Sequence, residues 1–417
     1  MNQHRKNLLE IYKAAISSVE GRFRVQNFLA KRTLKGQVCV IALGKAAISM
    51  AAGAADVLGS QIVDGLVVTR HGYVTDDHSV LDRFTIIESG HPFPDEASLE
   101  AGRQLLSVVQ ATPVNTRLLF LISGGTSSLI EVLPEGLSVN DLEALNRWLV
   151  GSGLPIHQIN EIRKRVSIIK GGRLAKHVQA HPVLNLMISD VNDNDPATIG
   201  SGLLAANRQS VAVPELNDIP ENLRALLEAG PEMPACDDAC FGHIESHVIA
   251  NLDEAMQSAA AYAENLGYEV TVHKDYVSGD VASVGEALSS YLRSAGNGLH
   301  IWGGETTVIL PDNPGTGGRC QSLALTVANE IKGKSQLFFL AAGTDGSDGP
   351  GEDAGALVDG GTIDRGNGYS IDAKSCLQMA DAGAFLAESG DLIFTGPTGT
   401  NVTDLFLGLK VDKAVNL

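Results

Sequence analysis

The stretch that decides the fold is QVCVIALG at residues 37–44, followed directly by KAAISMAAGAADVLG at residues 45–59. The first segment is a short apolar run that ends in a glycine, which is typical of a strand buried on both faces. The second segment is rich in alanine and has helical character. A buried strand followed by a helix is the repeating unit of α/β proteins.

Further apolar runs without strict alternation follow, and helical patterns separate them. The expected strands lie at residues 65–69, 84–90, 117–123 and 183–189, and the expected helices cover residues 96–110 and 138–153. Asp95 and Ser138 are suitable residues to begin these two helices. We therefore expect an α/β fold in which the N-terminal part has Rossmann-like layers around a parallel or mixed sheet.

Periodicity is lost between about residue 207 and residue 243, where four prolines interrupt the chain, and we expect an irregular linker there. A second strand–helix series begins with a strand expected at 247–250. It continues with helices at 251–267, at 281–296 and from Arg319, and with strands at 268–274, 299–304, 306–311, 336–343, 391–396 and 402–409. The prediction is two α/β domains, residues 1–243 and 244–417, the second being the smaller.

Composition excludes several functional classes. The 417 residues include 31 Lys and Arg against 49 Asp and Glu, a net charge of −18, so we expect no nucleic-acid partner. No apolar run reaches the roughly 18 residues of a membrane span, so we expect no membrane partner. Five cysteines, an odd and scattered set, argue against a disulfide framework. These features favour a cytoplasmic protein, and they leave open whether it forms a homo-oligomer.

Two loops that follow expected strands have the composition of anion sites. Gly44 and Lys45 lie where a strand meets a helix, so free N–H groups and a cationic side chain are close together. Ser123-Gly124-Gly125-Thr126-Ser127 follows the strongest strand and combines glycines with hydroxyl donors, which suits a phosphate or a carboxylate. A solvated lysine and a plain hydroxyl-capped turn are the alternatives.

A basic stretch and an acidic stretch add to this picture. Five basic residues crowd a short part of an acidic chain, which indicates an anionic small ligand or, alternatively, a solvated helix face; they are Arg163, Lys164, Arg165, Lys170 and Arg173. Asp190 ends a buried strand, where ligand sites of α/β proteins lie. Together with Asp193, Asp195 and neighbouring asparagines it is a candidate Mg²⁺ site, unless the segment is an acidic turn.

The C-terminal half contains four loops dense in Gly, Thr and Asp, at residues 303–307, 315–319, 344–349 and 395–401. Together they predict one polar cleft that handles an anion. Cys236, Cys240, His243 and His247 resemble a zinc site only superficially, since their spacing is not a standard one. No strand is followed by a GxGxxG motif, so a dinucleotide site has no support.

These motifs, in this order, resemble the glycerate 2-kinase family, whose C-terminal half is called the MOFRL domain. The matching segments run nearly end to end: residues 44–46, 90–95, 123–125, 160–164, 170–174, 189–191, 303–308, 317–319, 344–349 and 395–402. The resemblance implies two α/β domains, the second of the MOFRL type, with the active cleft between them.

The resemblance also implies a reaction: ATP and Mg²⁺ phosphorylate D-glycerate at its 2-hydroxyl group. On this reading Lys45 and Arg319 act on the γ-phosphate and the substrate carboxylate, and Asp190 orients the metal or accepts the hydroxyl proton. Asp345 and Asp348 are further metal candidates. The residues expected to bind the nucleotide are Gly44, Ser123, Gly124, Gly125, Thr126, Ser127, Lys170, Gly318, Thr398 and Asn401.

The chain departs from the family pattern at Leu203, Leu204, Cys320 and Ser322. Because these changes remove polar groups at expected cleft positions, a kinase for another small hydroxy acid or sugar acid is the first alternative. An NAD(P)H-dependent hydroxypyruvate reductase, a name that some family members carry, is the second. The missing dinucleotide motif counts against it.

Overall fold

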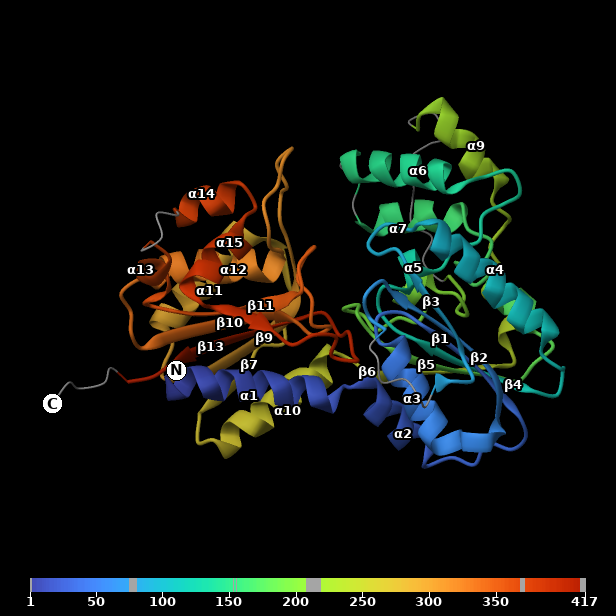
Figure 1. Ribbon diagram of the computed structural model, residues 1–417, viewed down its shortest axis with the longest axis horizontal. Coiled ribbons are helices and arrows are strands. Elements are labelled where there is room, and N and C mark those ends of the chain that lie inside the picture. The colour runs from blue at the N-terminus through green and yellow to red at the C-terminus, as the bar shows by residue number, and fades with distance from the viewer. Residues whose placement is uncertain are drawn as a thin grey trace. The chain divides into compact units, whose positions relative to one another are not determined.

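The computed structural model describes residues 2–74, 81–152, 154, 156–207, 219–367 and 372–412. These residues form two compact units, each with its own sheet (Figure 1). One unit is the continuous segment Gly21–Ala250, and the other combines Met1–Glu20 with Asn251–Leu417. Part of the expected linker, residues 208–218, lies outside the described residues.

The unit Gly21–Ala250 is built on a six-stranded sheet in which every pair of neighbouring strands is parallel. Its strands are β1 (Val38–Leu43), β2 (Ile62–Arg70), β3 (Thr85–Ser89), β4 (Arg117–Ile122), β5 (Val183–Ile188) and β6 (Ile244–Ala250). The spatial order is β3-β2-β1-β4-β5-β6. The predicted parallel α/β layers are therefore confirmed, and each apolar run from 37–44 to 183–189 contains a strand.

The described part of this unit also contains helices, two of which begin at capping side chains. They are α2 (Gly21–Leu29), α3 (Ala47–Leu58), α4 (Glu96–Ala111), α5 (Thr126–Leu129), α6 (Val139–Gly151), α7 (Ile156–Arg165), α8 (Leu174–Val178) and α9 (Glu221–Ala229), with short 3₁₀ turns at Gly59–Gln61, Ile199–Ser201 and Ala239–Phe241. The Asp95 carboxylate accepts the Ser98 N–H at 2.9 Å and so caps α4, as predicted. Ser138 likewise begins α6 in a capping box with Asp141.

Helices α6, α7 and α9 form a group with an apolar core of its own, apart from the sheet (Figure 1). Leu145, Leu149, Ile162 and Leu226 are among its buried members. The main core lies around the sheet, where all residues of β1 and β5 are buried. Such complete burial explains why these strands lack an alternating pattern.

The second unit contains a mixed sheet in the order β12-β11-β10-β13-β9-β7, with β8 also paired to β9. Its strands are β7 (Val270–Val272), β8 (Val277–Asp280), β9 (Gly298–Thr307), β10 (Leu337–Gly343), β11 (Asp353–Asp359), β12 (Leu392–Phe394) and β13 (Asp404–Lys410). Its helices are α1 (Gln3–Ser18), α10 (Leu252–Asn265), α11 (Val281–Ser294), α12 (Arg319–Glu330), α13 (Thr362–Asn367), α14 (Ala373–Gln378) and α15 (Ala382–Ser389). The two strands predicted at 299–304 and 306–311 are a single strand, β9, that ends at Thr307.

The division of the chain differs from the predicted one at both ends. The strand predicted to open the second domain is β6, and it pairs with β5 in the first sheet, so the units divide after Ala250 rather than after residue 243. Residues 1–20 belong to the second unit rather than the first. The apolar run of β6 was visible in the sequence, but a run of this kind does not reveal which sheet it joins.

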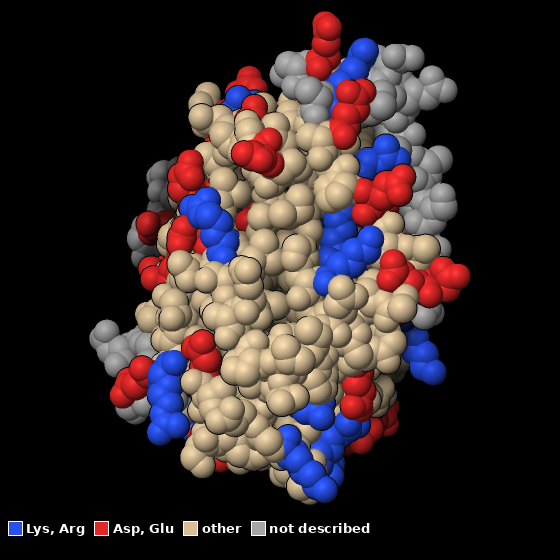
Figure 2. Space-filling model, turned by 90° about the vertical axis from the view of Figure 1, so that its right-hand side faces the viewer, with Lys and Arg blue, Asp and Glu red and all other residues tan. Residues whose placement is uncertain are grey.

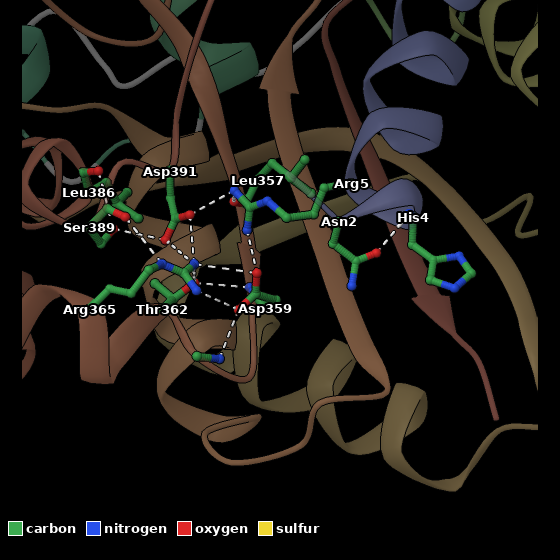
Figure 3. Close-up of polar contacts among 11 residues, drawn as sticks. Asn2, His4, Arg5, Leu357, Asp359, Thr362, Arg365, Leu386, Ser389 and Asp391 are labelled. Atoms are coloured by element: carbon green, nitrogen blue, oxygen red, sulfur yellow. Dashed lines mark hydrogen bonds and ion pairs between the residues drawn. The ribbon is translucent and has the colours of Figure 1, made fainter. Parts of the chain in front are cut away.

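Helix α1 is connected to the rest of the second unit by an ion-pair network (Figure 3). The Arg5 guanidinium donates to the carboxylates of Asp359 and Asp391, at 2.5 and 2.7 Å, and to the carbonyl of Leu357. Arg365 contacts the same two carboxylates. On another part of α1, the Tyr12 hydroxyl donates to the Gly343 carbonyl at 2.5 Å. None of the helices in the described ranges is long and apolar enough to cross a membrane.

Candidate active site

The parallel sheet has a topological switch point between β1 and β4. From β1 the chain moves outward through β2 and β3, returns to β4 on the other side of β1, and then moves outward again through β5 and β6. In open α/β sheets, ligands bind beyond the carboxyl ends of the strands at such a point. The segments that follow β1 and β4, residues 44–47 and 123–127, are the two candidate anion loops, and we call them the switch-point loops.

Backbone contacts join the switch-point loops. The Lys45 N–H donates to the Gly124 carbonyl at 3.0 Å, and the Ala46 N–H donates to the Ser123 hydroxyl oxygen at 3.0 Å. Gly44 has a φ of +116°, and a Cβ there would lie 2.3 Å from Ser123 Oγ. Only glycine therefore allows the two loops to approach this closely.

Lys45 and His91 both lie close to Gly125. A methyl group on Gly125 would lie 3.2 Å from Lys45 Cγ and 3.2 Å from His91 Cδ2. His91 was not among the predicted site residues, although it directly follows the strand predicted at 84–90. Its position after a parallel strand was the available signal, because the carboxyl ends of parallel strands share one edge of the sheet.

Three of the five residues in the basic stretch, which the sequence indicated as a positive patch for an anionic ligand, are bound by other parts of the protein. Lys164, Lys170 and Arg173 are buried, and each is engaged by protein acceptors. Lys164 pairs with Glu161 at 2.7 Å, Lys170 pairs with Glu131, and Arg173 donates to backbone carbonyls. On the face shown in Figure 2, acidic and basic side chains are interspersed among uncharged residues.

Lys170 nevertheless contacts a switch-point loop. Its ammonium group donates to the Ser127 carbonyl at 2.7 Å while it pairs with Glu131, and all but a small fraction of both side chains is buried. The predicted nucleotide-binding role of Lys170 therefore competes with a structural one, in which the lysine holds the loop through its backbone.

Asp190 follows β5 and is half-buried. The neighbouring carboxylates of the acidic stretch are used by the turn itself: Asp193 accepts from the Asp195 N–H at 3.1 Å, and Asp195 accepts from the Ala197 N–H at 2.9 Å. Within the described ranges, no three His, Cys, Asp or Glu side chains form a group that could hold a metal ion. Of this stretch, Asp190 is the residue whose position suits a ligand.

The second unit gathers charged groups around Arg319, the first residue of α12. Arg319 Nε and Nη2 donate to the two carboxylate oxygens of Asp404, at 2.6 and 3.1 Å, and Nη1 donates to Glu305. We call these three residues the Arg319 cluster. The two carboxylates raise the pKa of the guanidinium although its burial opposes this, so Arg319 stays charged. Glu305 lies in a predicted loop, whereas Asp404 was not singled out from the sequence.

Asp348 caps helix α12. Its carboxylate oxygens accept the N–H groups of Cys320 and Gln321, at 3.0 and 2.7 Å. A Cβ at Gly318 would lie 2.2 Å from an Asp348 oxygen, so glycine is needed for this approach. Burial raises the pKa of Asp348 to about 7 despite the two N–H donors. These contacts favour a capping role over the predicted metal-binding role.

The remaining predicted residues of this unit belong to one loop system. The Thr398 hydroxyl donates to the Thr344 carbonyl at 2.5 Å, and the Thr398 N–H donates to the Asp345 carbonyl at 3.4 Å. The Asp345 carboxylate accepts from the Ser347 N–H at 2.9 Å. Asn401 is buried in the same segment. The loops at 344–349 and 395–401 are thus in contact. The predicted polar cleft requires such a contact between these two loops.

Two other features that the sequence analysis considered can now be placed in the structure. Leu203, Leu204, Cys320 and Ser322, taken as cleft positions, are buried, and the first three pack within the two apolar cores. Burial also raises the pKa of the Cys320 thiol well above its usual value. In the set that resembled a zinc site, Cys236 is exposed while Cys240 is buried, and these residues form no metal-binding group in the described part of the chain.

Comparison with known proteins identifies the family. A family described as "Domain of unknown function (DUF4147)" matches residues 7–228, and the MOFRL family matches residues 298–404. "D-glycerate 2-kinase" of Thermotoga maritima is 35% identical over 98% of each chain. "Glycerate 2-kinase" of Pyrococcus horikoshii is 34% identical over 91% of this chain and 89% of its own.

Solved structures agree. A crystal structure of glycerate kinase from Thermotoga maritima matches with a TM-score of 0.80 at 34% identity and covers 98% of this chain and 99% of its own. A Pyrococcus horikoshii structure matches with a TM-score of 0.73 at 30% identity and covers 99% of this chain and 100% of its own. The resemblance inferred from the sequence motifs is confirmed: this chain is a kinase that belongs to the glycerate 2-kinase family with a MOFRL domain.

Proposed function

We propose that this protein transfers the γ-phosphoryl group of ATP to the 2-hydroxyl group of D-glycerate, with Mg²⁺, and releases 2-phosphoglycerate and ADP. The observation that carries the proposal is the position of Lys45, which stands at the switch point beside a loop of glycines and hydroxyl groups. The glycerate 2-kinase names of relatives from Thermotoga maritima and Pyrococcus horikoshii support the choice of acceptor.

Phosphoryl transfer requires little covalent chemistry from the protein. It requires that the attacking and leaving oxygens be held in line and that charge on the transferred group be neutralised. In the proposal, the N–H groups of Gly124 and Gly125 and the ammonium group of Lys45 bind phosphate oxygens, because the N–H groups of residues 44–47 already donate within the protein. Ser123 and Thr126 are buried and already contact backbone groups, so their contribution is to shape the loop.

Asp190 is the proposed acceptor of the hydroxyl proton or ligand of the metal. The 2-hydroxyl oxygen of glycerate forms a bond to the γ-phosphorus while the bond from that phosphorus to the ADP oxygen breaks. The hydroxyl proton passes to a base, and a half-buried carboxylate at the end of β5 has the right chemistry for this. Arg319 is proposed to bind the substrate carboxylate or a phosphate group, both of which match a guanidinium.

Asp190 in one unit and Asp345 in the other each have the donor chemistry that suits Mg²⁺, since carboxylate oxygens are its usual protein ligands. This ion is commonly bound through one or two carboxylates, with nucleotide phosphates and water completing the shell. A site of that kind does not need a cluster of three protein ligands. When bound, the ion would neutralise charge on the phosphates. Asp348 fits less well, because both of its oxygens accept backbone N–H groups.

The test is ATP consumption by the purified protein with Mg²⁺ in the presence of D-glycerate, L-glycerate, hydroxypyruvate, tartronate or four-carbon sugar acids. We expect turnover on D-glycerate, and ³¹P NMR should identify 2-phosphoglycerate rather than the 3-isomer. Omission of Mg²⁺ should abolish the reaction.

Other results would select another function. Turnover on a different acid would retain the kinase chemistry and change the acceptor, although burial of Leu203, Leu204 and Cys320 removes the structural reason to expect this. A relative from Agrobacterium vitis, 34% identical over 96% of this chain, carries a hydroxypyruvate reductase name. Oxidation of NADH or NADPH by hydroxypyruvate, followed by absorbance, would favour that activity and contradict the proposal.

A further inference from the structure

The Arg319 cluster contains two carboxylates that differ sharply in exposure. The Asp404 side chain is 3% exposed, whereas the Glu305 side chain is 47% exposed. Asp404 takes two donors of the guanidinium, Nε and Nη2, and Glu305 takes Nη1. The guanidinium therefore has one buried partner that binds two of its nitrogens and one solvent-exposed partner that binds a single nitrogen.

We infer that Asp404 is a positioning residue that fixes the Arg319 guanidinium, and that Glu305 is an exchangeable partner that an anionic group of the nucleotide or of the acid substrate replaces. This inference rests on the proposed function, in which Arg319 binds such a group. It adds two residues to the site and gives them opposite effects on anion binding.

The fixed role of Asp404 follows from its place in the sheet. It is the first residue of β13, which lies between β10 and β9, and it pairs with Gly343 on one side and Gly304 on the other. A carboxylate that binds Nε and Nη2 together sets both the position and the plane of the guanidinium. Because Asp404 is buried, a ligand that arrives from solvent meets the Nη1 side of Arg319 instead.

The exchangeable role of Glu305 follows from charge. With Asp404 and Glu305 both ionised, the cluster has a net charge of −1, which does not attract an anion. Two like charges close together near a protein surface repel each other. A phosphate or carboxylate that takes the place of Glu305 at Nη1 avoids this repulsion, and the exposed Glu305 side chain is free to rotate into water.

The test measures anion binding without turnover, by calorimetric titration of ATP alone and of D-glycerate alone. For the anion that Arg319 binds, Glu305→Gln should tighten binding about 3- to 10-fold, because a competing charge is removed. Asp404→Asn should weaken the same binding at least about 10-fold, because the guanidinium loses its anchor. Asp404→Glu should recover part of the loss.

Asp312→Asn is the matched control for charge. Asp312 is an exposed carboxylate in the segment between β9 and α12, so the change removes one negative charge without touching the Arg319 cluster. If Asp312→Asn and Glu305→Gln tighten anion binding equally, the effect is a general one of net charge. That result would overturn the proposal that an anion replaces Glu305 at Arg319. A purely structural Asp404 would lower the melting temperature and leave the affinity of the folded fraction unchanged, which would overturn the positioning role.

The outcomes separate the two proposals. Binding by the wild type without turnover of D-glycerate contradicts the proposed function alone. Turnover by the wild type, with unaltered affinities in Glu305→Gln and Asp404→Asn, contradicts the inference alone. Failure of the wild type to bind either anion contradicts both.

Discussion

Lys45 owes its position to neighbours that carry no charge. Gly44 allows the backbone to come close to Ser123, and the Ser123 hydroxyl accepts the Ala46 N–H, so the residue between Gly44 and Ala46 is held against the second loop. The Lys45 N–H itself bonds to Gly124. This backbone is thus pre-organised, which is the condition under which a cation stabilises a transition state at low cost.

Replacing Lys45 by Met tests its assigned role. We expect kcat to fall at least about 100-fold, because a positioned charge on the transferred group is lost. The melting temperature should stay within about 2 °C of the wild type, since changes at partly exposed positions alter stability little. Steady-state kinetics and a thermal melt measure both quantities. Lys176→Met, at an exposed position of α8, should change neither, and near-normal turnover of Lys45→Met would remove Lys45 from the mechanism.

Lys170 and Lys164 form a matched pair for a second test. Both are buried and both are ion-paired, but Lys170 also contacts the Ser127 carbonyl. Each change to Met leaves a buried carboxylate unpaired, which costs about 3–5 kcal/mol, so both variants should melt at lower temperature. Lys170→Met should in addition raise KM for ATP, because the switch-point loop loses a support. An equal KM for both variants would show that the Lys170 contact is only structural.

The basic stretch shows that the identity of a residue does not determine which groups its side chain contacts. Five cations within eleven positions, residues 163–173, indicated an anion site, yet three of them are buried with protein partners. Their acceptors are Glu131, Glu161 and backbone carbonyls such as that of Pro231, and two of these, Glu131 and Pro231, lie far from the stretch in sequence. No local rule pairs a lysine with a glutamate 39 positions away.

At the scale of elements, the sequence predicted the strands of the parallel sheet well and the second sheet less well. Strands such as β1 and β5 are apolar throughout because both faces are covered, and this signal is strong. β11 contains Asp, Gly and Ala and was not predicted, since residues that favour strands are few in it. α13, α14 and α15 have eight residues or fewer, too short for a periodic pattern to be recognised.

Strand β9 contains a histidine whose protonation makes the stability of the fold depend on pH. His300 is buried, its ring lies near His273 and Trp302, and its Nε2 has no hydrogen-bond partner among the described residues. Burial is the main cause that lowers its pKa, and the nearby His273 lowers it further. The unfolded chain therefore takes up a proton at higher pH than the folded protein does, and stability is lost as the pH falls below about 6.5.

His300→Gln should reduce this loss. We expect the melting temperature of the wild type to drop between about pH 7.5 and pH 5.5, and the drop to be smaller in the variant because one buried titrating group is absent. Thermal melts across this range measure the difference. His247→Gln, at a partly exposed site on β6, is the control. A variant as sensitive to acid as the wild type would contradict the assignment.

At the scale of the whole molecule, the two units do not coincide with the first and second halves of the sequence. The unit Gly21–Ala250 is continuous and has its own cores, whereas the other unit needs the first twenty residues as well as the last part of the chain. Leu8, Ile11, Tyr12 and Ala15 of α1 are buried, and Arg5 joins α1 to Asp359 and Asp391 (Figure 3). Large apolar side chains that become fully buried each contribute about 1.5–3 kcal/mol.

This division predicts which segments fold alone. Residues 21–250 should give a cooperative thermal transition when expressed by themselves, because their sheet and cores are complete. Residues 251–417 should not, because removal of α1 uncovers apolar surface and leaves Asp391, which is buried, without Arg5.

A synthetic peptide of residues 1–20, added at saturating concentration, should restore the transition through binding to the folded state. The same peptide with Arg5→Ala should restore it less well than one with Lys13→Ala, since Lys13 is exposed and pairs with its neighbour Glu10 on the same helix. A cooperative transition of residues 251–417 without any peptide would show that α1 is dispensable, and the ion pairs of Arg5 would then be a surface feature rather than part of the fold.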